Sequence, residues 1–250
     1  MKDKPKVYFV GAGPGDPGLI TKKGDELLKL ADHIIFTGSL INKEVLNVKK
    51  SSCKTEDSSK LTKEEIIGKM SESALQGKIV VRLHTGDPSL YGAIQEQVDA
   101  LKEKSINIKI IPGISAFQGS ASSLQRELTL PGITQTVVLS RIKGKTSLPG
   151  EEDLKDIASL KTTLCLYLSV HDIGNVVKQL TEGGLEKTTP VAVIFKATWP
   201  EEKIYKTALI IVGKVLEAEK ENYQDSKLYH PNFEHEYRKK QEKNLDGDNQ

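Results

Sequence analysis

The sequence predicts an α/β protein with two domains and mostly parallel sheets. Apolar runs rich in β-branched residues alternate with stretches of helical periodicity, as in parallel sheets covered by helices. Three runs in the first half end in loops rich in glycine and proline, at residues 11–18, 84–92 and 112–115. Such loops meet at the carboxyl ends of parallel strands, where α/β proteins bind ligands.

The N-terminal domain is expected over residues 1–113 and opens with a strand, a glycine-rich turn and a helix. Thr62 and Glu65 have the spacing of a capping box, which predicts the start of a second helix that Gly77 ends. In order, we expect strands at residues 6–10, 33–37, 78–83 and 107–111. A first helix should carry the apolar residues between Leu19 and Ala31, and two further helices should span residues 62–77 and 93–104.

The C-terminal domain is expected over residues 114–213, with a junction near 113–130 and the same alternation at different spacing. Residues 214–250 form a charged tail, expected to be peripheral or disordered apart from a short helix near Val215. In order, we expect a helix at 114–126, a strand at 135–141, a helix at 151–159, a strand at 163–169, a helix at 172–181 and strands at 190–195, 203–208 and 209–212.

Composition narrows the classes of function. Lys and Arg number 36 against 34 acidic residues, and this near balance argues against a dedicated nucleic-acid-binding protein. The apolar runs are too short to cross a membrane, and the N-terminus lacks a signal-peptide core, so we expect a cytoplasmic protein with no membrane partner. Cys53 and Cys165 have neither zinc-site nor disulfide spacing, so no protein-bound metal is expected.

The loop GAGPGDPG at residues 11–18 carries the strongest signal for a ligand. It departs from the dinucleotide fingerprint, because Asp16 stands where the third glycine belongs, and it lacks the Lys-Ser/Thr pair of a phosphate-binding Walker loop. Pro14 and Pro17 also remove amide donors that a phosphate would need. A nucleoside without phosphate, such as S-adenosylmethionine, fits better, and the alternative is a purely structural turn.

The loop HTGDPSLYG at residues 84–92 also follows a strand, so it should face the same crevice. Asp87 is a candidate acceptor for a ribose hydroxyl or an ammonium group; the alternative is a cap for a helix beginning near Ser89. The segment KATWPEEKI holds Trp199, which we expect to serve packing. Near these loops, Arg82, His84 and Lys196 could meet substrate carboxylates or be ordinary polar groups.

Together these segments resemble the tetrapyrrole (corrin/porphyrin) methylases. The motifs VGAGPGDPGLIT, HTGDPSLYG, PGIS, KATWPEEKI and TALIIVG occur in that family's order between residues 6 and 213. The longer matches VRLHTGDPSLYGAIQEQ and LTLPGITQTVVLSR are most similar to members that methylate carbon 11 of precorrin-4 or cobalt-precorrin-4. The resemblance implies a homodimer that transfers the methyl group of S-adenosylmethionine, held between the domains, to an anionic tetrapyrrole in corrin-ring biosynthesis.

The resemblance also implies the site residues. No residue is assigned as a general base, because the sequence offers no distinctive pair. Gly38 stands where related enzymes often carry an acid, so only Ser39 of that segment is placed in the substrate cleft. Cofactor contacts are expected at Pro14, Thr85, Gly86, Asp87, Leu90, Ser115, Ala116, Leu168, Ala197 and Ala208, and substrate contacts at Ser39, Arg82, His84 and Lys196.

Other functions stay open on the sequence. A methylase of this family could act on a different ring carbon, on ribosomal RNA or on the diphthamide precursor, although the lack of a basic excess disfavours RNA. A non-catalytic nucleotide-sensing module is distinguished by binding without turnover. A dehydrogenase is distinguished by NAD binding.

Overall fold

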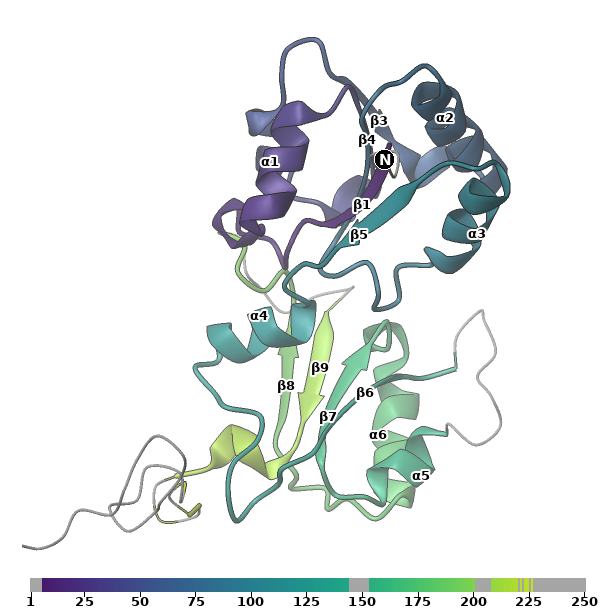
Figure 1. Cartoon of the computed structure of the whole chain (residues 1–250). Coiled ribbons are helices and arrows are strands. Elements are labelled where there is room, and N and C mark those ends of the chain that lie inside the picture. Colours follow the sequence, from purple (N-terminus) through teal and green to yellow (C-terminus); the bar gives the residue numbers. More distant parts are fainter. Residues whose placement is uncertain are drawn as a thin grey trace, which may run out of the picture.

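A computed structural model of the chain describes residues 6–143, 153–200, 208–219, 221, 223, 224 and 226. The helices and strands gather into two α/β units, one above the other in Figure 1, and the chain passes from one to the other after β5. No helix in these ranges is long and apolar enough to span a lipid bilayer.

The first unit contains a five-stranded sheet in the order β3-β2-β4-β1-β5, with every pair parallel. Parallel neighbours require a crossover between them, and helices supply most of these crossovers. The strands are β1 (Val7–Gly11), β2 (His33–Phe36), β3 (Lys54–Asp57), β4 (Val80–His84) and β5 (Ile108–Ile111), and the helices are α1 (Lys22–Leu30), α2 (Lys63–Leu75) and α3 (Gln95–Glu103).

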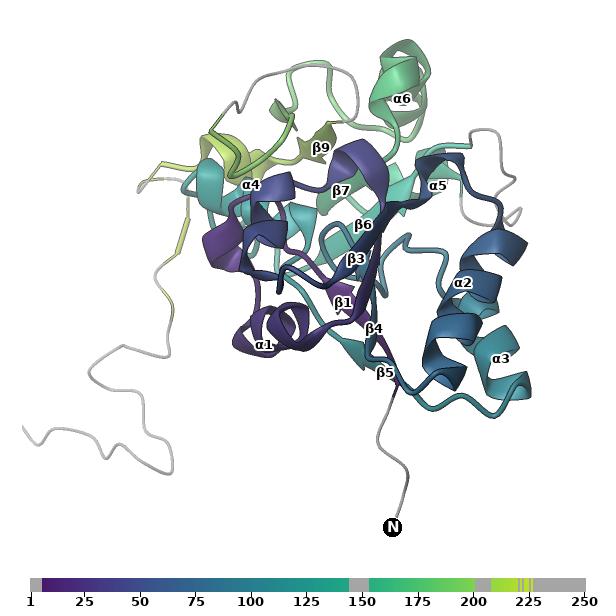
Figure 2. The same cartoon turned by 90° about the horizontal axis from the view of Figure 1, so that it is seen from above.

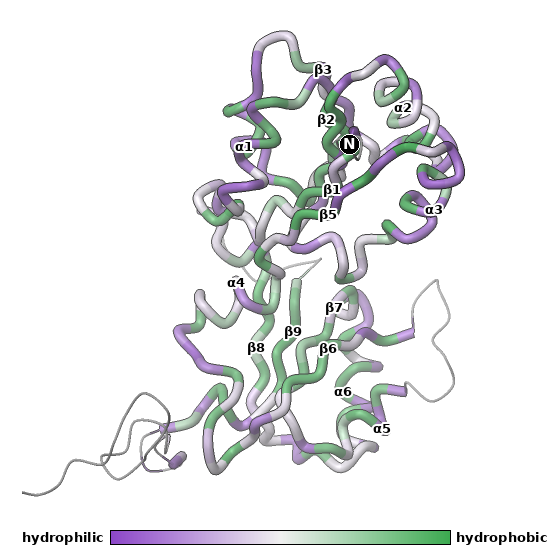
Figure 3. The backbone as a smooth tube through the Cα atoms, in the orientation of Figure 1, coloured by the Kyte–Doolittle hydropathy of each residue, from purple (hydrophilic) through white to green (hydrophobic). Residues whose placement is uncertain are grey.

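This sheet is covered on both faces, with α1 on one side and α2 and α3 on the other (Figure 2). Leu28 packs with Val10 and Leu83 on the α1 side, and Met70 and Leu101 pack on the opposite face. Burial on both faces explains why the central strands are continuous apolar runs rather than alternating ones. The hydropathy colouring of Figure 3 follows this arrangement.

The second unit contains a four-stranded sheet in the order β6-β7-β9-β8. Helices α5 and α6 pack on one face, and α4 lies against the other with Val215 of the short helix that follows β9. The elements are α4 (Ala116–Ser123), β6 (Val137–Arg141), α5 (Leu154–Ala158), β7 (Thr163–Tyr167), α6 (Ile173–Glu182), β8 (Val191–Ile194) and β9 (Leu209–Val212).

The second sheet is mixed, which corrects the expectation of mostly parallel sheets for this unit. The pair β6 and β7 is parallel, but β9 is antiparallel to both β7 and β8. Consecutive strands β8 and β9 are direct neighbours, and antiparallel neighbours need no crossover. As a result β7 and β8 run toward the first unit, and β9 runs away from it.

Most predicted elements are confirmed, including the Thr62–Glu65 capping box and the short helix near Val215. The first helix begins later than predicted, at Lys22, because Pro17–Leu19 forms a separate 3-10 turn. Strand β3 was missed, since its sequence KTED has no apolar alternation. Of the strand expected at 203–208, only Ala208 lies within the described residues; most of the 214–250 tail lies outside them.

Candidate functional site

The three glycine-rich loops meet at the carboxyl ends of β1, β4 and β5. A side chain at Gly11 would place its Cβ 2.5 Å from the Gly86 carbonyl oxygen and 2.7 Å from the Gly113 Cα. The Gly86 amide donates to the Gly13 carbonyl at 2.8 Å, which joins the first two loops by a backbone bridge. Gly11 and Gly113 are therefore required because backbones cross at this point, and Gly86 is favoured by its φ of 60°.

Asp87 fastens the second loop to the third. Its Oδ2 accepts a hydrogen bond from the Gly113 amide at 2.9 Å, and its Oδ1 accepts from the Ser89 amide at 2.8 Å and from the Ser89 hydroxyl. Burial alone would raise the pKa of Asp87, but these hydrogen bonds outweigh it and hold the pKa below its usual value. Residues 88–91 form a turn, so Asp87 stabilises a turn rather than the expected helix start.

The loop after β8 lies against the first glycine loop. The Trp199 indole Nε1 donates to the Pro14 carbonyl at 3.1 Å, and the Asp16 amide donates to the Thr198 Oγ1 at 3.0 Å. A Cβ at Gly15 would overlap the indole ring. The packing role expected for Trp199 is thus confirmed, and the packing joins the two units.

A second group of contacts forms around Tyr167, at the end of β7, and it reaches the first unit through Tyr91. Its hydroxyl is hydrogen-bonded to the Ser115 Oγ at 2.7 Å and accepts from the Phe117 amide at 3.2 Å. The Tyr167 ring lies 5.0 Å from the Tyr91 ring, centroid to centroid. Burial is the main cause of a raised pKa for Tyr167, so this hydroxyl remains protonated.

Four residues beside these contacts have a strained backbone conformation. Tyr91, Leu168, Lys196 and Thr198 all have positive φ, at 54°, 52°, 51° and 69°, although none is glycine. Non-glycine residues in this conformation are uncommon and cluster at binding sites, where the surrounding structure enforces them. Leu168 also leaves 60% of its surface exposed at the end of β7.

All ten residues expected to contact a cofactor lie on the facing edges of the two units. Those of the first unit follow β1 and β4, whereas those of the second lie at the start of α4, follow β7 and β8 or precede β9. Thr85 and Leu168 are exposed, whereas Ser115, Ala197 and Ala208 are buried. The set is Pro14, Thr85, Gly86, Asp87, Leu90, Ser115, Ala116, Leu168, Ala197 and Ala208.

Arg82 and His84, expected to meet substrate carboxylates, are instead buried under α3, at 4% and 3% exposure. Arg82 donates to the Ile35 carbonyl and to the Gln97 Oε1, and burial lowers its pKa to about 10. Burial, reinforced by the nearby Arg82 charge, lowers the pKa of His84 to about 3. Both side chains face α3 because alternate residues of β4 lie on that side of the sheet, and this burial favours the alternative that they are hydrogen-bonded polar groups rather than direct contacts of a substrate.

Lys196 and the segment around Ser39 complete the predicted set. The Lys196 Nζ lies 4.5 Å from the centre of the Trp199 ring, a cation–π contact, in the loop after β8. Ser39 belongs to a short 3-10 helix, Gly38–Leu40, after β2. Gly38 has φ of 48°, and a Cβ there would lie 3.1 Å from the Asp57 Oδ1, so an acid at this position would be strained and repelled.

Sequence reasoning missed Tyr91, Tyr167 and Thr198 as parts of the site. Tyr91 lies within the quoted HTGDPSLYG motif, and Tyr167 ends a predicted strand beside Leu168, so position alone could have indicated both. No local signal marks Thr198. Within the described ranges, no group of three or more His, Cys, Asp or Glu side chains could hold a metal ion.

The family model described as tetrapyrrole (corrin/porphyrin) methylases matches residues 6–210. The chain belongs to this family. Among the tetrapyrrole methylases, a cobalt-precorrin-4 C(11)-methyltransferase of Methanocaldococcus jannaschii is 47% identical over 97% of this chain and all of its own length. A precorrin-4 C(11)-methyltransferase of Mycobacterium tuberculosis is 39% identical over 89% of this chain and 95% of its own.

Solved structures of the family have the same fold. A cobalt precorrin-4 methyltransferase, described as a cobalamin biosynthetic enzyme, aligns with a TM-score of 0.82 and 39% identity, over 84% of this chain and 95% of its own. A uroporphyrin-III C-methyl transferase of Thermus thermophilus, complexed with S-adenyl homocysteine, aligns with a TM-score of 0.73 and 27% identity. The alignment covers 86% of this chain and 96% of that structure's chain.

Proposed function

We propose that this protein is an S-adenosylmethionine-dependent methyltransferase that methylates carbon 11 of precorrin-4 or cobalt-precorrin-4 in cobalamin biosynthesis. The observation that carries the proposal is the convergence of three glycine-rich loops and the loops after β7 and β8 at one junction between the units. The strong similarity to relatives named for this reaction, over nearly the whole chain, selects it within the family.

The junction is suited to a nucleoside with a cationic sulfur and no phosphate. Gly86 has φ of 60°, and a Cβ there would lie 3.7 Å from Ser115 Cα and from the Ala116 amide, so a side chain would fill the space beside them. Exposed Thr85 supplies a hydroxyl, and exposed Leu168 supplies an apolar surface for a flat base. Asp87 adds a negative charge near these loops, which disfavours phosphate and favours a cation.

S-adenosylmethionine supplies an electrophilic methyl group, and the carbon–sulfur bond breaks with its electron pair left on sulfur as S-adenosylhomocysteine. The ring carbon is itself the nucleophile, so this chain's residues mainly align the reactants and exclude water. Ser115 and Tyr167 fix the start of α4, and Trp199 fixes the first glycine loop. We assign no residue as a general base.

The tetrapyrrole is proposed to bind along the same junction, beside the segment of Ser39 and the loop of Lys196. Lys196 is the cation suited to a ring carboxylate, because its ammonium is in the loop facing the first unit. Arg82 and His84 are proposed to act only from beneath, by supporting β4 and the loop that follows it, since both are buried. Cobalt, where present, would be held by the macrocycle as part of the substrate.

The test is to incubate the purified protein with S-adenosylmethionine carrying a labelled methyl group and with precorrin-4 or cobalt-precorrin-4. Mass spectrometry should show one added methyl group, and NMR should locate it at carbon 11. The preferred substrate would decide between the metal-free and cobalt forms. A methyl group on another ring carbon, or tight cofactor binding without transfer, would contradict the proposal and point to the alternative family activities or to a sensing module.

A homodimeric, cytoplasmic enzyme is also part of the proposal, and its support is the family resemblance. Light scattering on the purified chain should give twice the monomer mass of 27.5 kDa. A monomeric mass at working concentrations would contradict the dimer. Fractionation of cells should recover the protein with the soluble enzymes, and recovery with the membranes would contradict the location.

A further inference from the structure

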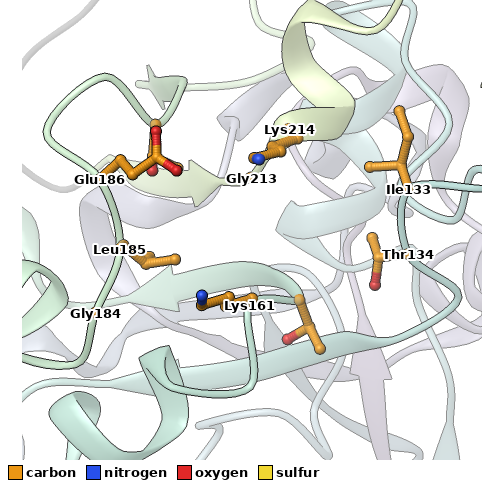
Figure 4. A pocket seen from close by; sticks show the side chains of 10 residues that line it. Ile133, Thr134, Lys161, Gly184, Leu185, Glu186, Gly213 and Lys214 are labelled. Atoms are coloured by element: carbon orange, nitrogen blue, oxygen red, sulfur yellow. The ribbon is translucent and has the colours of Figure 1, made fainter. Parts of the chain in front are cut away.

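A small cavity lies at the end of the second unit that faces away from the junction (Figure 4). Its volume is about 90 Å³. It is bounded where β7 begins and β9 ends, whereas the junction lies at the opposite ends of these strands. The five residues of β7 separate the two sites by about 15 Å. The lining comes from Ile133, Thr134, Lys161, Thr162, Gly184, Leu185, Glu186, Thr189, Gly213 and Lys214.

The lining includes two lysine side chains, Lys161 and Lys214. Lys161 precedes β7 and Lys214 follows β9, and in Figure 4 both side chains extend toward the segment of Leu185 and Glu186. Neither lysine forms an ion pair with any residue that the structure describes. Lys161 has φ of 51°, the left-handed conformation that ends helix α5, and its amide donates to the Ala158 carbonyl.

Hydroxyl groups complete the lining. The Thr162 Oγ1 is buried and has no hydrogen-bond partner among the described residues. A buried polar atom without a partner is destabilising and is normally satisfied by a bound water or ion. The amides of Lys161, Thr134, Thr189 and Gly213 already donate to backbone carbonyls, so a ligand would be recognised here by side chains.

We propose that this cavity binds a phosphate group, either as inorganic phosphate or as the head of a small phosphomonoester. Two lysine ammoniums and a hydroxyl match the several oxygen acceptors and double charge of phosphate. The cavity volume of about 90 Å³ leaves room for a group of the size of phosphate. Glu186 opposes binding by reducing the positive charge of the lining.

Calorimetric titration of the full-length protein with inorganic phosphate, at constant ionic strength and pH, tests the proposal. We expect saturable binding that becomes about tenfold weaker in Lys161→Gln and in Lys214→Gln, and tighter in Glu186→Gln. Thr162→Val, which replaces the hydroxyl with a methyl group of similar size, should also weaken binding. Lys102→Gln, an exposed lysine of α3, is the matched control and should bind phosphate as the unmodified protein does.

S-adenosylhomocysteine affinity and thermal melting should be unchanged in the lysine variants, which separates this site from the junction and from misfolding. A methyl phosphomonoester and succinate serve as further probes. If the methyl phosphomonoester binds as tightly as phosphate, the site accepts the phosphate head of a small phosphomonoester. If the monoester does not bind, the site is specific for inorganic phosphate. The proposal is overturned by no saturable phosphate binding, by phosphate affinity in the lysine variants equal to that of the unmodified protein, or by succinate binding as tightly as phosphate.

Discussion

The indole Nε1 of Trp199 donates a hydrogen bond to the carbonyl oxygen of Pro14 at 3.1 Å, across 185 positions of the sequence. The same indole ring lies over Gly15, where no side chain would fit. One residue of the second unit thus fixes the position of the glycine loop that follows β1 in the first. Because β7 and β8 both point toward the first unit, their following loops are the natural places for such contacts.

Trp199→Phe should weaken binding of S-adenosylhomocysteine about fivefold. The change keeps an aromatic ring over Gly15 but removes the donor, and one hydrogen bond contributes about 1 kcal/mol. Gly15→Ala should weaken binding more and also lower the melting temperature, since its Cβ must displace the ring. Calorimetry and thermal denaturation measure both effects, and equal affinity in Gly15→Ala and the unmodified protein would show that this contact does not shape the site.

Asp87→Ala should lower both stability and cofactor affinity. The carboxylate accepts hydrogen bonds from Gly113 and Ser89, so its loss leaves these donors unpaired at a cost of about 1–3 kcal/mol. Denaturant unfolding and calorimetry with S-adenosylhomocysteine give the two values. Ser89→Ala is the control, because it removes one donor of the turn and keeps the link to Gly113. Unchanged affinity in folded Asp87→Ala would remove Asp87 from the binding site.

The sequence predicts those parts of the site that depend on residues close together in the chain. Glycines after strands mark the crossing at Gly11, Gly86 and Gly113, since only close backbones require them in that pattern. Contacts between distant segments, such as Trp199 with Pro14, have no local signal. The burial of Arg82 was missed for a related reason: strand alternation gives two faces but does not say which helix covers each. Strand β3 was missed because an edge strand can be polar throughout.

Lowering the pH should remove a stabilising contribution from Glu56, which lies in β3, an edge strand of the first unit's sheet. Burial favours its neutral form, but hydrogen bonds from Lys54 and Lys69 outweigh this and lower the pKa of Glu56 from 4.5 to about 2. A carboxylate with a lowered pKa stabilises the fold above its unfolded pKa, and this contribution is lost as the pH falls through the folded value.

The unmodified protein should therefore exceed Glu56→Gln in unfolding free energy by on the order of 2 kcal/mol at neutral pH. The difference should shrink as the pH falls from 4.5 toward about 2. Urea unfolding at a series of pH values measures it. The exposed acid Glu64, in the first turn of α2, offers a control, since Glu64→Gln should leave the pH dependence nearly unchanged. A difference that stays constant over this range would rule out the ion-pair explanation.

Leu168→Gly should bind S-adenosylhomocysteine more weakly without losing stability. Leu168 holds φ of 52° and is 60% exposed, so its side chain contributes little to the core while its backbone is strained. Glycine adopts this conformation freely, and the relief of about 1 kcal/mol offsets its greater chain entropy when unfolded. Leu168→Ala is the matched variant, because it removes the same apolar surface and keeps the strain. Both variants should lose affinity to a similar degree by calorimetry, and only glycine should hold or raise the melting temperature. Full affinity in Leu168→Ala would mean that this exposed leucine serves something other than the cofactor.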